Sequence, residues 1–247
     1  RWNVGSGEDF SGMFESCIQF VSDLSKWDVA EAKKMDRMFW SASSFTSDLS
    51  NWEVSKVTDM SKMFAEASAF NSDVTKWNVE KVNSMTGIFE DAKQFNCSLA
   101  SWNLKGLLEK TITLSGCGMG VANYDRTIEG WSKLDPSVTG ITVEADGLIY
   151  SKDAKDAHDN ILTSVRSWKF KKDKCSENES SRHKLSLEPT QMTINLGSSM
   201  DVKYKIDPDY VNGNNIGWTS TEPTVAVYNS TTKKVDGKKV GSTILRC

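Results

Sequence analysis

The sequence predicts a repeat solenoid of short β-strands and short helical turns, closed by an α/β cap and followed by an all-β sandwich. The first observation is a tryptophan that returns every 25 residues, at Trp2, Trp27, Trp52, Trp77 and Trp102. The second is a hydrophobic stretch after residue 107 that leaves this register, and the third is a run of short alternating segments after residue 183. Repeats of one short unit bury their apolar faces against each other. We therefore expect about four repeats over 1–107, a cap over 108–172, a linker over 173–183 and a sandwich over 184–247.

Further apolar residues keep step with the tryptophans. Two phenylalanine columns stand 12 and 18 residues after each of the first four tryptophans, and methionines recur 8 and 11 residues after most of these tryptophans. We expect the solenoid core to contain the five tryptophans together with Phe14, Phe39, Phe64, Phe89, Phe20, Phe45, Phe70 and Phe95. Each buried aromatic ring removes about 150–250 Å² from water, which stabilises the fold by several kcal/mol at roughly 25 cal/mol per Å².

Within one repeat, two local patterns stand out. Residues 70–77 alternate in polarity, which predicts a short strand. Residues 59–67 carry Met60, Met63, Phe64 and Ala67 at helical spacing, which predicts a helical turn. In the first repeat Gly7 replaces the aliphatic residues of the later ones, so we expect this repeat to be looser or reshaped.

The repeat as a whole, W-x-V-x-x-V-x-x-M-x-x-M-F-x-x-A-x-x-F-x-x-D-L-x-x-W, resembles the BspA-like repeat of bacterial surface proteins and mycoplasma lipoproteins. The resemblance covers residues 1–107. It implies a leucine-rich-repeat-like solenoid and a role in adhesion at the cell surface.

The segment 108–172 stands where a solenoid needs a cap of different sequence. Strands are expected at 140–143 and 148–150, and a helix before Trp168. In that helix Ala154, Ala157, Ile161 and Val165 recur at three to four residues and form one apolar face.

Residues 173–183 are polar and predict a linker. After them, short alternating runs are separated by turn signals such as Asn212-Gly213. Together with Leu187-x-Pro189 and Trp218-x-Ser220-x-x-Pro223, these runs resemble a bacterial Ig-like domain of group 2. The resemblance implies that Trp218 packs in the core between two sheets.

Composition narrows the function. The net charge is −3 and no basic patch is present, so nucleic acid is not expected as a partner. No apolar run is long enough to span a membrane. The chain opens on an in-register tryptophan, so we expect it to be a fragment whose signal, anchor and N-terminal cap lie outside it.

His158 and His183 lie in no nucleophile motif, and neither phosphate loop nor metal-ligand spacing occurs. We expect no enzyme activity, no metal and no cofactor.

The cysteines leave two possibilities open. Cys17 occupies the small core column of Ala42, Ala67 and Ala92, which favours a buried free thiol. Cys97 in the last repeat and Cys117 in the cap form either a disulfide or two free thiols.

Two features on the outer surface are candidates for binding. Asp23, Asp48 and Asp73 form an acidic column, which either holds calcium or a basic partner, or bonds backbone amides at turns. Trp40 stands where other repeats carry Glu15, Ala65 and Glu90, so it is either an exposed interaction residue or packed on a neighbouring side chain.

We expect a non-catalytic, extracellular module, secreted or attached to the cell surface, that binds a protein or glycan on a host or neighbouring cell. The Ig-like segment would act as a spacer, and further modules of the same parent chain are expected partners. The alternative is a structural spacer or a phage-particle decoration protein without a ligand of its own.

Overall fold

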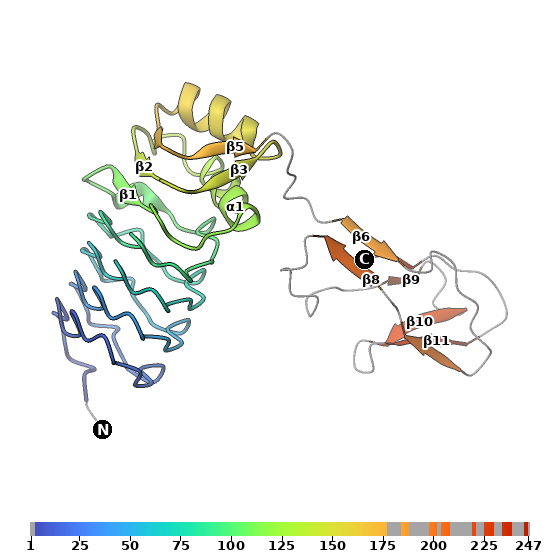
Figure 1. Ribbon diagram of the computed structural model, residues 1–247, viewed down its shortest axis with the longest axis horizontal. Coiled ribbons are helices and arrows are strands. Elements are labelled where there is room, and N and C mark those ends of the chain that lie inside the picture. Colours follow the sequence, from blue (N-terminus) through green and yellow to red (C-terminus); the bar gives the residue numbers. More distant parts are fainter. Residues whose placement is uncertain are drawn as a thin grey trace. The chain divides into compact units, whose positions relative to one another are not determined.

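The computed structural model describes residues 3–176, 184–187, 198–201, 204–207, 219–220, 225–229, 234–238 and 245–246. The chain divides into two compact bodies, Arg1–Ser181 and Arg182–Cys247. Figure 1 shows the N-terminal body as a row of similar loops that leads into the elements β1 to β5.

Successive repeats in the N-terminal body pair in parallel. Isolated bridges join Asp9 to Lys34, Lys34 to Asp59 and Asp59 to Ser84, and a further bridge joins Met85 to Ile112. Backbone amides of one repeat donate to carbonyls of the next repeat, as from Phe39 to Met63 at 2.9 Å. The 25-residue interval of the sequence is therefore the interval of the backbone pairing.

Each repeat makes two consecutive tight turns beside these bridges. In the second repeat the amide of Met38 donates to the carbonyl of Met35 (3.2 Å), and that of Ala42 donates to Phe39 (3.0 Å). The third residue of each turn has positive φ, 55° at Arg37 and 57° at Ser41, which is the geometry of a type II turn. These left-handed residues interrupt extended backbone, so each repeat pairs through single bridges.

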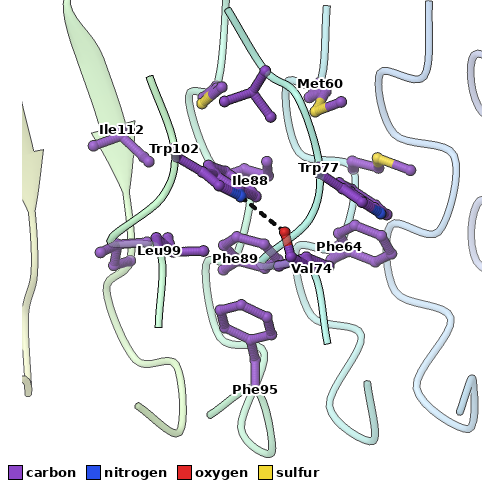
Figure 2. Close-up of a cluster of buried hydrophobic side chains, with 14 of the residues drawn as sticks. Met60, Phe64, Val74, Trp77, Ile88, Phe89, Phe95, Leu99, Trp102 and Ile112 are labelled. Atoms are coloured by element: carbon purple, nitrogen blue, oxygen red, sulfur yellow. Dashed lines mark hydrogen bonds between the residues drawn. The ribbon is translucent and has the colours of Figure 1, made fainter. Parts of the chain in front are cut away.

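The core of the N-terminal body is a set of aromatic columns. Phe64 and Phe70 stack with centroids 3.9 Å apart, and Phe64 lies 5.7 Å from Phe89 of the next repeat. Figure 2 shows Phe64 and Phe89 beside Trp77 and Trp102, and the indole of Trp102 is bonded to the carbonyl of Val74 at 3.0 Å. Buried aromatic side chains of the columns are Phe14, Phe39, Phe45, Phe64, Phe70, Phe89, Phe95, Trp52, Trp77 and Trp102. Phe20 and Trp27 are half-buried, while Trp2 and Trp218 lie outside the described side chains.

Helices and strands begin only after the repeats. A 3₁₀ turn, η1 (Leu104–Gly106), precedes β1 (Thr111–Thr113), α1 (Val121–Trp131), β2 (Thr142–Glu144) and β3 (Ile149–Ser151). A helix with π-type hydrogen bonds, η2 (Asp156–Val165), precedes β4 (Lys169–Lys171) and β5 (Lys174–Ser176). The strands form two parallel sheets, of order β1-β2-β4 and β3-β5. Because the bridge from Met85 reaches Ile112 in β1, the first sheet continues the pairing of the repeats.

The helix expected before Trp168 has a different buried face from the predicted one. Ala154 and Ala157 are buried, but Val165 is 77% exposed and Leu162 is buried in its place. The prediction assumed α-helical spacing, whereas π-type bonds run from residue i to i+5 and turn later residues away from that face.

The described strands of the C-terminal body form three small antiparallel sheets. β6 (Lys184–Leu187) pairs with β8 (Tyr204–Asp207), and β9 (Thr219–Ser220) pairs with β12 (Leu245–Arg246). β11 (Lys234–Gly237) lies between β7 (Ser199–Asp201) and β10 (Ala226–Asn229).

The fold class predicted from the sequence is wrong. Residues 3–103 hold neither a strand nor a helix, only turns and isolated bridges, so a leucine-rich-repeat-like solenoid of strands and helical turns is not formed. In the part of the C-terminal body that is described, the strands lie in separate sheets of two or three, and no all-β Ig-like sandwich is evident. The repeat pattern predicts which side chains share an environment, but it does not specify backbone dihedrals. The positive φ angles, as at Lys62 and Glu66, fall within the expected helical turn of residues 59–67 and exclude a right-handed helix there.

Candidate functional site

Trp40 is half-buried and contacts two side chains of the next repeat. Its indole Nε1 donates to Oε1 of Glu66 at 3.3 Å, and Nζ of Lys62 lies 4.9 Å from the ring centroid. Glu66 also accepts a hydrogen bond from the hydroxyl of Ser41 at 2.7 Å. The ring of Trp40 therefore packs on flanking side chains and still keeps part of its surface exposed to water.

These contacts fix the orientation of the ring. A cation near an aromatic face contributes about 0.5–1 kcal/mol at exposed sites, and the bond to Glu66 restricts rotation about the side chain. A held, partly exposed indole with an acid and an amine beside it can stack on a flat or apolar ligand surface and bond polar groups at its rim. We call Trp40, Ser41, Lys62 and Glu66 the Trp40 cluster.

Sequence reasoning missed Lys62 and Glu66 as partners of Trp40. The signal was available in the 25-residue register, because the equivalent of Trp40 in the next repeat is Ala65. Residues next to that position lie beside Trp40 once the repeats stack, and the pairing of Ser41 with Ala65 (2.8 Å) shows this directly.

The acidic column is occupied by local hydrogen bonds. Oδ1 of Asp48 accepts from the amide of Ser50 at 2.9 Å and from the hydroxyl of Ser72, in the next repeat, at 3.2 Å. Asp23 and Asp73 bond the amides of Ser25 (2.8 Å) and Thr75 (2.9 Å) in the same way. These hydrogen bonds lower the pKa of all three carboxyls. The arrangement corresponds to the turn-forming alternative for these residues.

Metal binding gains no support from the column. Across residues 3–176 and the shorter described segments, no group of three or more His, Cys, Asp or Glu side chains is placed to hold an ion.

Gly7 makes room for an aromatic side chain. A Cβ at this position would lie 2.6 Å from Cζ of Phe10. Phe10 stands in the column that Met35, Met60 and Met85 occupy in later repeats. The first repeat is thus reshaped around a larger ring.

The described cysteines Cys17, Cys97, Cys117 and Cys175 form no disulfide. Burial raises the pKa of Cys97 and of Cys117 to about 11, which makes both poor nucleophiles. The expectation that Cys17 is buried is wrong, because its side chain is exposed. Cys17 belongs to the first repeat, whose outer side no described residue covers, whereas Ala42 in the same column is buried.

A buried polar network in the N-terminal body was also missed. Nδ1 of His158 lies 2.6 Å from Asp159, and Nε2 lies 3.1 Å from Asp173, which also accepts from the hydroxyl of Tyr124 at 2.8 Å. Burial alone would lower the pKa of His158, but the bonds to Asp173 and Asp159 outweigh it and raise the pKa. His158 therefore joins η2 to Asp173, just before β5, through hydrogen bonds that favour its protonated form, and α1 is joined to the same carboxylate through Tyr124.

A family model described as "Mycoplasma protein of unknown function, DUF285" matches residues 8–131. This match spans half of the chain, from the first repeat to the end of α1. The chain belongs to this family. The searches of curated proteins and of solved structures found no match. No described helix of this family member is long and apolar enough to cross a membrane.

Proposed function

We propose that the chain is a non-catalytic adhesion module, displayed at the cell surface or secreted, that binds a protein or glycan through the Trp40 cluster. The observation that carries the proposal is the half-exposed indole of Trp40, held by Lys62 and Glu66 at a position where other repeats carry Glu15, Ala65 or Glu90. Rigid aromatic side chains are over-represented among the residues that dominate binding energy.

Membership in a family of Mycoplasma proteins supports the surface assignment, together with the resemblance of the repeats to those of BspA-like surface proteins. The assignment as a non-catalytic protein rests on the groups described above. Of the described thiols with raised pKa, Cys97 is half-buried and Cys117 is buried, and the carboxylates of the acidic column are engaged at turns.

The test is a screen of the whole chain against arrays of host glycans and extracellular-matrix proteins, followed by titration of each hit. We expect saturable binding with a Kd that rises at least tenfold in Trp40→Ala, which corresponds to about 1.4 kcal/mol. Trp40→Phe should lose less, because it keeps a ring but not the bond to Glu66.

The matched control is Glu90→Ala, which changes the equivalent position two repeats further on. It should leave the Kd unchanged within about twofold. All variants must show the same melting curve as the unsubstituted chain, so that a change in Kd reports binding and not unfolding. Binding that persists in Trp40→Ala would move the site elsewhere, and no binding across both arrays would favour the structural spacer.

Location needs a separate experiment. Intact cells that express the protein should be labelled by an antibody raised against residues 3–176, and surface proteolysis should remove the signal. Labelling that needs permeabilised cells would contradict display at the surface.

A further inference from the structure

Trp40 stands alone as a partly exposed large apolar side chain in the middle of the repeats. Within residues 28–101, all of which the structure describes, every other Trp, Phe, Met, Ile, Leu and Val side chain is buried. A surface that binds a folded protein stably buries about 800 Å² on each partner, with an apolar patch at its centre. One indole among polar side chains instead suits a small ligand that has one apolar face and polar edges.

The polar groups that contact the indole both accept and donate hydrogen bonds. Oε1 of Glu66 accepts from Nε1 of Trp40 at 3.3 Å, and Oε2 accepts from the hydroxyl of Ser41 at 2.7 Å. Each carboxylate oxygen has two lone pairs, so Glu66 can accept further bonds. None of the ion pairs among the described residues includes Lys62, so its ammonium can donate to a ligand. Hydroxyl groups, which both donate and accept, match this set.

The charges around the indole disfavour a charged ligand. The guanidinium of Arg37 is already engaged, at 3.4 Å from Asp36 and 3.8 Å from Glu15. An anionic ligand would approach the carboxylate of Glu66, which is bonded to the indole itself. A cationic ligand would meet Lys62, which already lies over the ring at 4.9 Å from its centroid. The cluster is therefore complementary to a ligand without net charge.

We propose, as a step that rests on the proposed function, that the Trp40 cluster binds a neutral saccharide. A pyranose ring presents C–H groups on one face and hydroxyls around its edge. The C–H groups pack against the electron-rich indole of Trp40. The hydroxyls donate to the carboxylate of Glu66 and accept from the ammonium of Lys62. One aromatic platform supports weak binding, with a Kd on the order of 1 mM for a short oligosaccharide.

The probes are two matched pairs of sugars that differ in charge. Lactose is compared with sialyllactose, which adds a carboxylate, and the trimer of N-acetylglucosamine is compared with the trimer of glucosamine, whose amines are positively charged. The isotope-labelled whole chain is titrated with each sugar, and the Nε1–H signal of Trp40 is followed by NMR. Trp40→Phe identifies this signal by its loss. Because Nε1 is bonded to Glu66, a ligand at the carboxylate shifts the signal.

We expect at least one neutral sugar to saturate the shift of the Trp40 signal. Its charged counterpart should bind at least tenfold more weakly. Raising the salt concentration from about 50 mM to about 500 mM should change the Kd of the neutral sugar less than about twofold, because no net charge is brought to the cluster.

Glu66→Gln tests the origin of the charge selectivity. Glutamine keeps an acceptor for Nε1 of Trp40 but loses the negative charge. The variant should bind sialyllactose at least about fivefold more tightly than the unsubstituted chain does, while the Kd of lactose stays within about threefold. Equal weakening of both sugars would instead indicate a merely structural role. Glu90→Gln is the matched control, because it removes a carboxylate two repeats beyond Trp40, and it should change neither Kd.

The outcomes separate the ligand class from the binding site. Binding at Trp40 that prefers a charged sugar, or that occurs with matrix proteins alone, would overturn the neutral saccharide and leave Trp40 as the site. Absence of any neutral binder, both in these titrations and on the glycan array, would overturn it as well. Neutral sugars that bind Trp40→Ala with an unchanged Kd would overturn both the neutral saccharide at this cluster and the proposed site.

Discussion

The indole Nε1 of Trp77 donates a 3.0 Å hydrogen bond to the carbonyl oxygen of Leu49, 28 residues earlier in the chain. The bond recurs from Trp52 to Leu24 and from Trp102 to Val74, each at 3.0 Å. These three tryptophans thus satisfy their polar atoms on carbonyls 28 residues earlier, while their rings lie against the phenylalanine columns.

Trp77→Phe should lower the free energy of unfolding by about 1–3 kcal/mol, because a buried hydrogen bond and part of the packed ring are lost. Denaturant titration of the whole chain measures the change. Trp40→Phe is the control for the same substitution on a half-exposed side chain and should cost less than about 1 kcal/mol. Equal losses in the two variants would contradict a special role for the inter-repeat bond.

Gly106→Ala should destabilise the chain by about 1–3 kcal/mol, because the added Cβ would lie 2.1 Å from the carbonyl oxygen of Glu80. The last repeat and η1 would have to separate. At Gly120 an added Cβ would meet its nearest atom, Oδ1 of Asn96, at 3.7 Å, so Gly120→Ala should change stability by less than about 1 kcal/mol. Thermal melts of the two variants measure the difference in stability. A Gly106→Ala chain that melts like the unsubstituted chain would contradict the close approach between Gly106 and the carbonyl oxygen of Glu80.

His158 should make stability depend on pH. Its pKa is raised in the folded chain by Asp173 and Asp159, against the opposing effect of burial. The stabilisation is complete below the unfolded pKa of about 6.5 and is lost as the pH rises through the folded pKa. The free energy of unfolding should therefore fall above about pH 6.5.

His158→Gln should remove this part of the pH dependence, as followed by denaturant titrations between mildly acidic and mildly basic pH. His183 is kept in both proteins and serves as the internal control. If the variant retains the slope of the parent chain, the network of Tyr124, Asp173 and Asp159 does not hold a charged imidazole.

Cys97→Ser should leave stability unchanged or raise it by up to about 1 kcal/mol. Cys97 stands at the repeat position that Ser47 and Ser72 occupy in earlier repeats. The hydroxyl oxygens of these serines accept hydrogen bonds from the amides of Leu24 and Leu49, respectively, both at 2.8 Å. A serine at 97 can accept from Val74 in the same way and can donate to Asp73. Cys97→Ala lacks both bonds and is the matched comparison. A Cys97→Ser chain that melts below the Cys97→Ala chain would contradict this role.

Much of the N-terminal body could be anticipated from spacing alone. The interval between Trp52 and Trp77 is also the interval between paired residues such as Asp59 and Ser84. The fold class was nevertheless wrong, because periodicity reports shared environments and is silent about φ at residues such as Lys62 and Glu66. For the same reason the face of η2 was misplaced, since the π-type bonds that expose Val165 leave no mark in the spacing of apolar residues.

For the candidate sites, too, some features follow from the sequence and others only from the tertiary structure. By itself, the sequence determined that Trp40 departs from its column and that Asp48 belongs to one, because both are properties of the register. Only the tertiary structure decided that Trp40 is held by Lys62 and Glu66, that Asp48 is engaged by Ser50 and Ser72, and that His158 lies between two carboxylates. The physical reason is that a repeat interval fixes which residues are equivalent, whereas hydrogen bonds and burial depend on the dihedral angles that bring residues of different repeats or elements together.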